Sequence, residues 1–297
     1  MTSVITVPPS LDDHSFEQVL EQLASVPRDA KLVVDARHTR WASPYGLTAL
    51  LTLGQTRQER PSFTVPDTED TASYWARTGF FTHADELYDL HGSVPKARGG
   101  ESSVLLEITP ITRSDDVHNV VGRIQQKSQQ ILSKELNLEA KATVGFAMTL
   151  SEICQNIVEH AGCGGWVAVQ TYTWRKRLAN RRVVVIAVCD AGSGFRQSLE
   201  SAPGFVRSDR WDDAAALEAT VVRGVSRFRD PGRGQGIKGV RRYLSRWDGK
   251  LSVRSGTAKI AILPGWDDDL PLAEKLAPFP GSQVQDTKPE RVSGSPR

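Results

Sequence analysis

Residues 150–162 read LSEICQNIVEHAG, and their spacing predicts the helix around which the second half of the chain is built. Apolar residues in and just before this segment recur every three or four positions and form one core-facing stripe: Phe146, Leu150, Ile153 and Ile157. Glu152 and Asn156 stand one helical turn apart on a neighbouring stripe. A carboxylate so placed can take up a proton, and a carboxamide oxygen can hold a hard cation. The same pairing is common on solvated helix faces, so its meaning depends on what lies beside it.

Two glycine-rich segments follow this helix. The apolar strand VVVIAVC at 183–189 ends in Asp190, and Gly192 and Gly194 come directly after it. Glycines at a strand end let a flat group approach the backbone. Further on, residues 230–239 read DPGRGQGIKG and precede an amphipathic helical pattern. Glycines before a helix N-terminus leave backbone N–H groups free to bind an anion, and phosphate is the natural occupant.

Two common phosphate motifs do not account for this segment. The P-loop pattern GxxxxGK[ST] is absent. Gly234, Gly236 and Gly239 fit GxGxxG, but no strand precedes them and no acid follows at the distance that a dinucleotide-binding unit requires.

The three segments together, in this order, resemble the GHKL ATPase superfamily of DNA gyrase and the histidine kinases. ExxxN at Glu152–Asn156 resembles its N box, and DAGSG at 190–194 and GRGQGI at 232–237 resemble its two glycine boxes. SGTAKI at 255–260 resembles its terminal strand. The similarity spans about 140–263, and within the superfamily it is strongest to the anti-sigma-factor serine kinases.

That resemblance implies ATP and Mg²⁺ as cofactors and assigns a role to each motif. Asn156 would ligate the metal, Glu152 would be the general base, and Asp190 would accept a hydrogen bond from the adenine amino group. The base pocket would be completed by Gly192, Gly194 and Thr257. The phosphates would be wrapped by a lid containing Gly232, Arg233, Gly234, Gly236 and Lys238. The two lid cations are equally well interpreted as solvated charges.

Residues 1–92 resemble a STAS domain, the fold of anti-anti-sigma factors. The similarity rests on LVVDARHTRWASPYGLTALL at 32–51, where Asp35 and Gly46-Leu47 keep the family's places. Pro44 stands where the family has its phosphoacceptor serine, and a proline has no hydroxyl to phosphorylate. Ser43 is a candidate substitute, although its simpler interpretation is the N-cap of the following helix. The resemblance implies a docking module that is not switched in the usual way.

We therefore expect an α/β protein with a STAS-like domain at 1–92, a linker at 93–102, a two-layer ATP-binding domain at 103–263 and a disordered tail at 264–297. Strands at 166–174 and 182–189 should pair as a hairpin through the basic turn RKRLANR. Whether the two domains touch is left open.

Composition limits the functions that remain. With 37 basic and 35 acidic residues the net charge is +2, which gives no overall bias toward nucleic acid. The basic turn at 175–182 offers phosphate contacts, but its simpler interpretation is a solvated turn, so we do not expect nucleic acid as a partner. The cysteines Cys154, Cys163 and Cys189 predict buried thiols in a reducing compartment rather than a disulfide framework or a zinc site. The N-terminus lacks a signal pattern, and no apolar run reaches the ~18 residues of a membrane span.

We expect a cytoplasmic serine/threonine kinase that acts on a regulatory protein of the STAS or sigma-factor class, without a membrane partner. A homodimer is left open. The alternative is a protein-interaction module that ATP gates without phosphate transfer.

Overall fold

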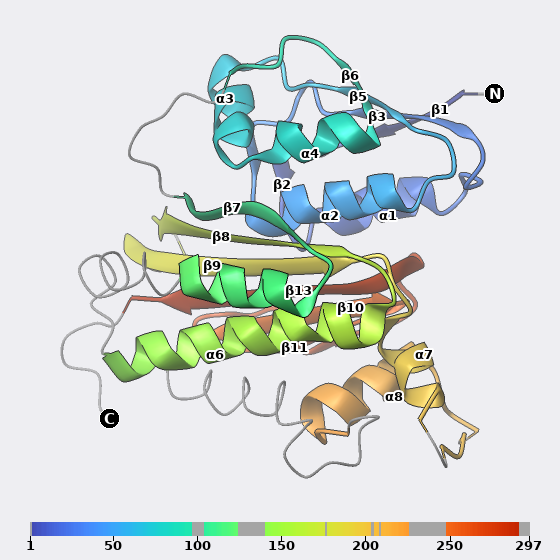
Figure 1. The fold of residues 1–297 in the computed structure, drawn as a ribbon, viewed down its shortest axis with the longest axis vertical. Helices are drawn as coiled ribbons and strands as arrows, with labels where there is room; N and C mark the ends of the chain where they lie inside the picture. The colour runs from blue at the N-terminus through green and yellow to red at the C-terminus, as the bar shows by residue number, and fades with distance from the viewer. Residues whose placement is uncertain are drawn as a thin grey trace.

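The described residues form a mixed α/β protein with two large sheets, one two-stranded pair, and helices packed against the large sheets (Figure 1). The computed structural model describes residues 2–96, 104–123, 140–175, 177–202, 205–207, 209–225 and 248–290.

The N-terminal unit is built on a four-stranded parallel sheet with the order β1-β3-β5-β6. Its strands are β1 (Thr2–Thr6), β3 (Lys31–Asp35), β5 (Ser62–Thr64) and β6 (Asp89–His91), with a short parallel pair β2 (Ser10–Leu11) and β4 (Trp41–Ala42) beside them. Its helices are α1 (Phe16–Leu23), α2 (Pro44–Gln55), α3 (Glu69–Arg77) and α4 (Phe80–Leu87). The parallel strands need helical crossovers, which α1 to α4 supply.

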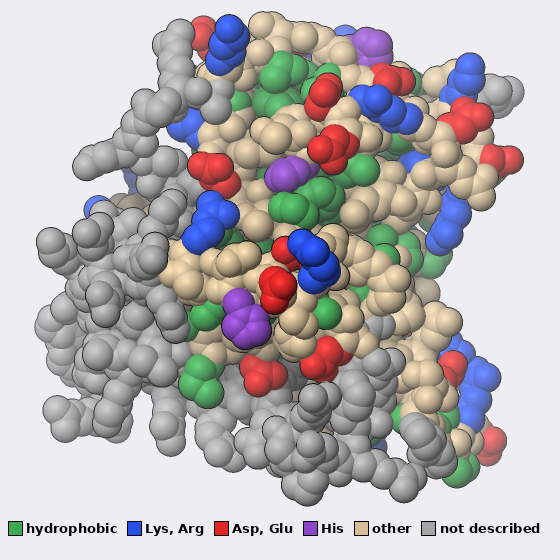
Figure 2. Space-filling model, viewed as in Figure 1, with side chains coloured by type: hydrophobic (Ala, Val, Ile, Leu, Met, Phe, Trp, Pro, Cys, Tyr) green, Lys and Arg blue, Asp and Glu red, His purple; other side chains and the backbone are tan. Residues whose placement is uncertain are grey.

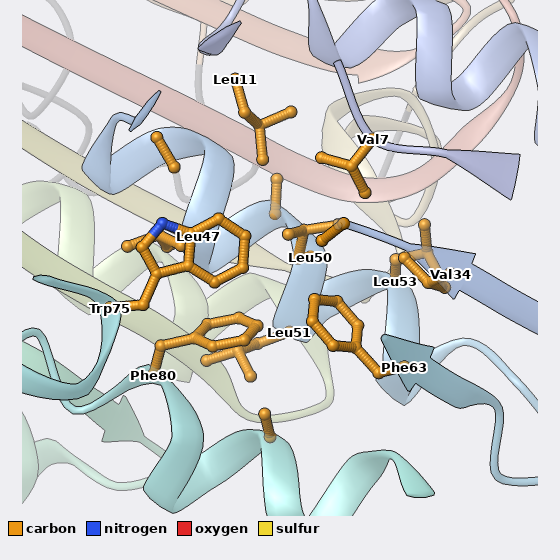
Figure 3. Close-up of a cluster of buried hydrophobic side chains, with 14 of the residues drawn as sticks. Val7, Leu11, Val34, Leu47, Leu50, Leu51, Leu53, Phe63, Trp75 and Phe80 are labelled. Atoms are coloured by element: carbon orange, nitrogen blue, oxygen red, sulfur yellow. The ribbon is translucent and has the colours of Figure 1, made fainter. Parts of the chain in front are cut away.

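Helix α2 is the centre of this unit, because every residue from Pro44 to Gly54 is buried. Its start has strong signals: the Gly46 N–H donates to the Ser43 hydroxyl at 3.1 Å, and proline stands at the first helical position. The predicted N-cap role of Ser43 is confirmed. Figure 3 shows the leucines of α2 among aromatic side chains from the sheet and from the later helices.

The second unit is built on a seven-stranded antiparallel sheet with the order β12-β11-β10-β13-β9-β8-β7. Its strands are β7 (Val104–Ile111), β8 (Gly165–Trp174), β9 (Arg181–Asp190), β10 (Lys250–Gly256), β11 (Ala258–Ile262), β12 (Leu272–Ala273) and β13 (Phe279–Pro289). Its helices are a run at 114–123, α6 (Ala140–Asn156) with a π-helical turn (Ile157–Ala161), α7 (Gly194–Glu200), and α8 (Asp213–Leu217) with a second π-helical turn (Glu218–Val222). The predicted hairpin is confirmed as β8 and β9.

The two faces of the large sheet are covered by different layers. Along β9, Ile186 and Val188 point into the core shared with α6, whereas Ala187 and Cys189 point into the core of the N-terminal unit. Figure 1 shows the sheet edge-on, with α6 on one side and α2 on the other. A strand buried on both faces carries a continuous apolar run, which is what residues 183–189 show.

The predicted disordered tail at 264–297 is wrong for its described part. Residues Phe279–Pro289 form β13, which lies between β9 and β10 in the middle of the large sheet. The strand was hidden because its residues are mostly polar, and only their partners in distant parts of the chain make their burial favourable. Residues 291–297 lie outside the described part of the chain.

The two units share one hydrophobic core and are not joined by a linker alone. Trp166, Ala187 and Phe279 from the large sheet belong to the same buried cluster as α2. The Trp166 indole N–H donates to the Gln55 amide oxygen at 2.9 Å. The contact between domains that the sequence left open is therefore extensive, although part of the expected linker, residues 97–102, is not described.

Buried ion pairs also join the units. The Arg254 guanidinium is fully buried and donates from Nε to Glu17 of α1 at 2.7 Å. Lys259 Nζ lies 3.1 Å from Asp13 Oδ2. Charges removed from water need such partners, so these pairs fix the orientation of one unit on the other.

Candidate functional site

The site begins at the C-terminal end of α6, which runs without interruption into the π-helical turn Ile157–Ala161. The predicted apolar stripe is confirmed at Leu150, Ile153 and Ile157, which are buried against the sheet. The Phe146 side chain is not among those that the structure describes. Glu152 is exposed and Asn156 is half-buried. Among described residues, none bonds to the Asn156 carboxamide. Single π-helical turns inside α-helices occur frequently at functional sites.

This helix end lies directly against the loop that follows β9. The Ser193 N–H donates to the Ala161 carbonyl at 3.1 Å. A side chain on Gly192 would place its Cβ only 2.1 Å from the same carbonyl oxygen, so no larger residue fits there. Asn156 precedes Ala161 by five residues, roughly 7 Å along the helix axis. The structure thus brings the ExxxN and DAGSG segments together at one end of the sheet.

Asp190 is the buried acid of this site, with 2% of its surface exposed. Its Oδ1 accepts the Gly192 N–H at 2.8 Å, and its Oδ2 accepts the hydroxyl of Ser282. Burial raises the pKa of this carboxyl, and the hydrogen bonds from Ser282 and Gly192 offset only part of that effect. A carboxylate has about four acceptor positions, so Asp190 can still accept from a further donor.

Strand β13 closes the site on the far side of Asp190. Gly281 has φ +77°, and a Cβ there would lie 2.0 Å from the Asp190 carbonyl oxygen. The Gln283 amide donates to that same oxygen at 3.2 Å. Gly194, with φ +69°, would clash with Ser255 and with the Gly281 carbonyl if it carried a side chain. Three glycines therefore let three backbone segments converge around one carboxylate.

Ser282 is the site residue that sequence reasoning missed. The available signal was Gly281-Ser282 at the start of an alternating segment, the same glycine-hydroxyl pattern as Gly256-Thr257. The second copy was overlooked because it lies in the part expected to be disordered.

Thr257 has a different place from the one predicted. Its hydroxyl donates to Asp213 Oδ2 at 2.8 Å, and its N–H donates to the same oxygen at 2.9 Å. Asp213 is the first residue of α8, so Thr257 anchors that helix to the β10–β11 turn. The neighbours of β9 are β8 and β13, and β11 lies two strands beyond β13, so the contact with Asp190 is made by Ser282 of β13.

The predicted acid/base residue is electrostatically perturbed. Although Glu152 is exposed, partial desolvation of its carboxyl raises its pKa, and the negative charge of Glu159 raises it further. Glu159 lies on the same helical run and accepts from the Gln155 amide at 3.0 Å. A carboxyl with a raised pKa is better suited to exchange a proton near neutral pH than an ordinary glutamate.

The phosphate lid stays a prediction. Gly232, Arg233, Gly234, Gly236 and Lys238 all fall within 226–247, outside the described residues. The cysteine prediction is confirmed for Cys154 and Cys189, which are buried, and is wrong for Cys163, which is exposed.

No family model matches this chain, and no curated protein matches it. Within the described ranges, no helix combines the length and the apolar character needed to cross a bilayer. On the face seen in Figure 2, acidic and basic side chains of the described residues are interspersed, as the near-balanced composition predicts.

Proposed function

We propose that this chain is a cytoplasmic ATP-binding regulatory protein: a serine/threonine kinase of the anti-sigma-factor type with a STAS-like N-terminal unit. The observation that carries the proposal is the convergence of the α6 end, the Asp190 loop and Ser282 at one end of the large sheet. Three segments distant in sequence meet there around a buried carboxylate, and two of them are the segments that the motif resemblance requires.

The adenine end of such a site fits the residues present. Asp190 is held by the Gly192 N–H and the Ser282 hydroxyl, which fix the carboxylate in one orientation. An amino group on a purine is the donor that this acid can accept. Guanine offers a carbonyl at the same ring position, which a carboxylate repels, so the site should prefer adenine.

The metal end has a matching donor set. Asn156 offers an amide oxygen, a ligand type that Mg²⁺ accepts together with phosphate oxygens and water. Glu152, one turn earlier, would take the proton from an incoming hydroxyl, and its raised pKa suits that role. Bound Mg²⁺-ATP supplies the transferable phosphoryl group, and the work of the protein is positioning and charge neutralisation.

We expect the hydroxyl that receives the phosphate to come from another protein. Ser43, the candidate acceptor in the STAS-like unit, is 4% exposed, and its side chain caps α2. Pro44 beside it offers none. A separate regulatory protein of the STAS or sigma-factor class is therefore the proposed substrate. A homodimer, if one forms, cannot use the sheet face that the N-terminal unit already covers.

One observation favours a second candidate function, an ATP-gated interaction module that transfers no phosphate. The end of α2 that carries Ser43 and Pro44 is buried between the units, so the N-terminal unit is built to stay docked. In that case nucleotide binding would change the surface that the two docked units together offer to a partner protein.

Transfer of radiolabel separates the two functions. The full chain is incubated with Mg²⁺ and γ-labelled ATP, alone and with purified STAS proteins and sigma factors, and compared with Glu152→Gln. Label on a partner that is lost in Glu152→Gln but kept in Glu86→Gln, an exposed glutamate on α4, supports the kinase. Tight ATP binding without transfer in either protein supports the gated module.

A further inference from the structure

The orientation of the Asp190 carboxylate depends on one peptide unit at the start of β13. The Ser282 hydroxyl donates to Oδ2 of this acid, and the Ser282 backbone N–H also bonds to the carboxylate and lowers its pKa. Gly281 lies so close that a Cβ on it would stand 2.6 Å from Asp190 Oδ1. The placement of the peptide between Gly281 and Ser282 therefore decides how two donors meet the buried acid.

The sheet ladder alone does not fix that peptide. Along β10, the pairing with β13 shifts register between Ser255 and Gly256, which leaves Gly281 without a partner in β10. On the other side of β13, pairing with β9 begins only at Gln283. An irregularity of this kind re-aims the backbone beside it and leaves its own residues unpaired, so the Gly281 backbone needs a partner from elsewhere.

The hydroxyl of Ser255 supplies that partner. It is buried, with 4% of the residue exposed, and it donates to the Gly281 carbonyl at 2.7 Å. A peptide unit is planar and trans, so its C=O and its N–H point in opposite directions. The hydrogen bond that holds the Gly281 carbonyl on one side therefore aims the Ser282 N–H on the other side, toward Asp190.

The same hydroxyl also holds the loop that follows Asp190. Ser255 Oγ accepts the Phe195 N–H at 3.2 Å. This N–H belongs to the first turn of α7, where backbone donors have no partner within the helix and the N-cap Ser193 makes no side-chain bond to them. A Cβ on Gly194 would lie 2.6 Å from Ser255 Oγ, so the loop lies directly against this hydroxyl. Ser255 thus links the two segments that donate hydrogen bonds to Asp190.

We propose that Ser255 is the positioning residue of the adenine site, and that it holds the start of β13 and the loop after β9 in the one arrangement that orients the Asp190 carboxylate. It acts on the acid only through other residues, by the bonds to Gly281 and Phe195. Its importance for base binding rests on the proposed function. Its effect on Asp190 is a property of the chain without nucleotide.

The first test therefore uses the full chain without nucleotide. Protein isotope-labelled at the aspartate carboxyl carbons is titrated by NMR, and the Asp190 signal is identified by its loss in Asp190→Asn. Because the hydrogen bonds to this acid lower its pKa, Ser255→Ala should make Asp190 titrate at higher pH than in the unmodified chain. Ser252→Ala changes a buried serine on the same strand and should leave the titration unmoved. Cys163 and Cys189 also interact with Asp190, but the pKa of each thiol is raised, so neither changes charge in the acid range.

A second measurement needs no variant. The amide protons of Phe195 and Ser282 should exchange slowly with solvent in the unmodified chain, because each donates a hydrogen bond inside the site. The amide of Asp268, whose side chain is fully exposed, gives the fast reference rate.

ATP binding then tests the part that rests on the proposed function. Ser255→Ala should weaken ATP affinity about threefold, the order of one weakened hydrogen bond, and Ser252→Ala should not change it. If Ser255→Ala moves the Asp190 titration but not even the unmodified chain binds ATP, the proposed function fails and the positioning role stands. If ATP binds equally to the unmodified chain and to Ser255→Ala, the role in base binding is overturned.

The positioning role itself is overturned by either of two results, whatever the ATP affinity. One is an Asp190 titration at the same pH in folded Ser255→Ala protein as in the unmodified chain, with folding checked by thermal melts. The other is exchange of the Phe195 and Ser282 amides as fast as that of Asp268.

Discussion

The hydroxyl of Ser282 donates to the carboxylate of Asp190, so that the last long strand of the chain completes the site formed by the DAGSG loop. Because β13 lies between β9 and β10, its start is beside Asp190, and the β10–β11 turn is one strand further away. The glycine-hydroxyl pair that serves the buried acid is therefore Gly281-Ser282 and not Gly256-Thr257.

This arrangement predicts which hydroxyl matters for nucleotide binding. Ser282→Ala should weaken ATP affinity about fivefold, the effect of losing one hydrogen bond to the carboxylate. Thr257→Ala should leave that affinity nearly unchanged, because this hydroxyl bonds to Asp213. Titration of both variants with a fluorescent ATP analogue distinguishes them, and a larger loss in Thr257→Ala would restore the assignment based on sequence alone.

The central position of β13 predicts that the C-terminal segment is required for folding. A chain that stops after Leu263 would leave the inner edges of β9 and β10 without partners and should lose its cooperative thermal transition. A chain that stops after Glu290 keeps β13 and serves as the control. Circular dichroism melts measure both, and a cooperative melt in the shorter chain would contradict this role of the strand.

The elements that the sequence predicted correctly are those whose signals are local. The stripe of α6 follows from the three- and four-residue spacing of Leu150, Ile153 and Ile157, and each of these residues needs only the sheet beneath it. The hairpin of β8 and β9 follows in the same way from two apolar runs joined by a short turn.

The elements that the sequence did not predict depend on partner residues that are distant along the chain. In β13, Gln283 is buried because it donates to the Asp190 carbonyl, and Gln285 is buried because it donates to Asp13. Between Pro280 and Pro289, Val284 is the one apolar side chain among polar residues and a glycine, which is the composition of a loop. The shared core of the two units was hidden for the same reason, since Trp166 and Phe279 meet α2 only in the folded chain.

The interface between the units should depend strongly on one buried ion pair. Glu17→Gln removes the carboxylate from the fully buried Arg254 and should lower the free energy of unfolding by about 3 kcal/mol, because it leaves a buried charge without its partner. Urea denaturation measures this loss.

The matched control is the pair formed by the exposed Arg37 and the half-buried Asp35, 2.7 Å apart, where Arg37→Gln should change stability less than Glu17→Gln does. A double variant, Glu17→Met with Arg254→Met, should recover much of the loss. If Glu17→Gln lowered the free energy of unfolding no more than Arg37→Gln does, the Glu17–Arg254 pair would not fix the units on each other.

The raised pKa of Glu152 predicts a pH dependence for phosphate transfer. A general base works only when deprotonated, so the transfer rate should fall as the pH falls through the pKa of Glu152, which lies above its ordinary value of 4.5. Glu159→Gln removes the neighbouring negative charge and should move this acid limb to lower pH. Transfer rates measured across the acid range in the unmodified protein and in Glu159→Gln test this shift. If the rate falls at the same pH in both proteins, a group other than Glu152 causes the fall.

The most direct test of the central proposal is equilibrium binding of ATP to the full chain with and without Mg²⁺, measured by isothermal titration for the unmodified protein and for Asp190→Asn. We predict magnesium-dependent binding of ATP, markedly weaker binding of GTP, and at least a roughly tenfold loss of ATP affinity in folded Asp190→Asn protein. Absence of ATP binding, or equal binding by the two proteins, would contradict the account.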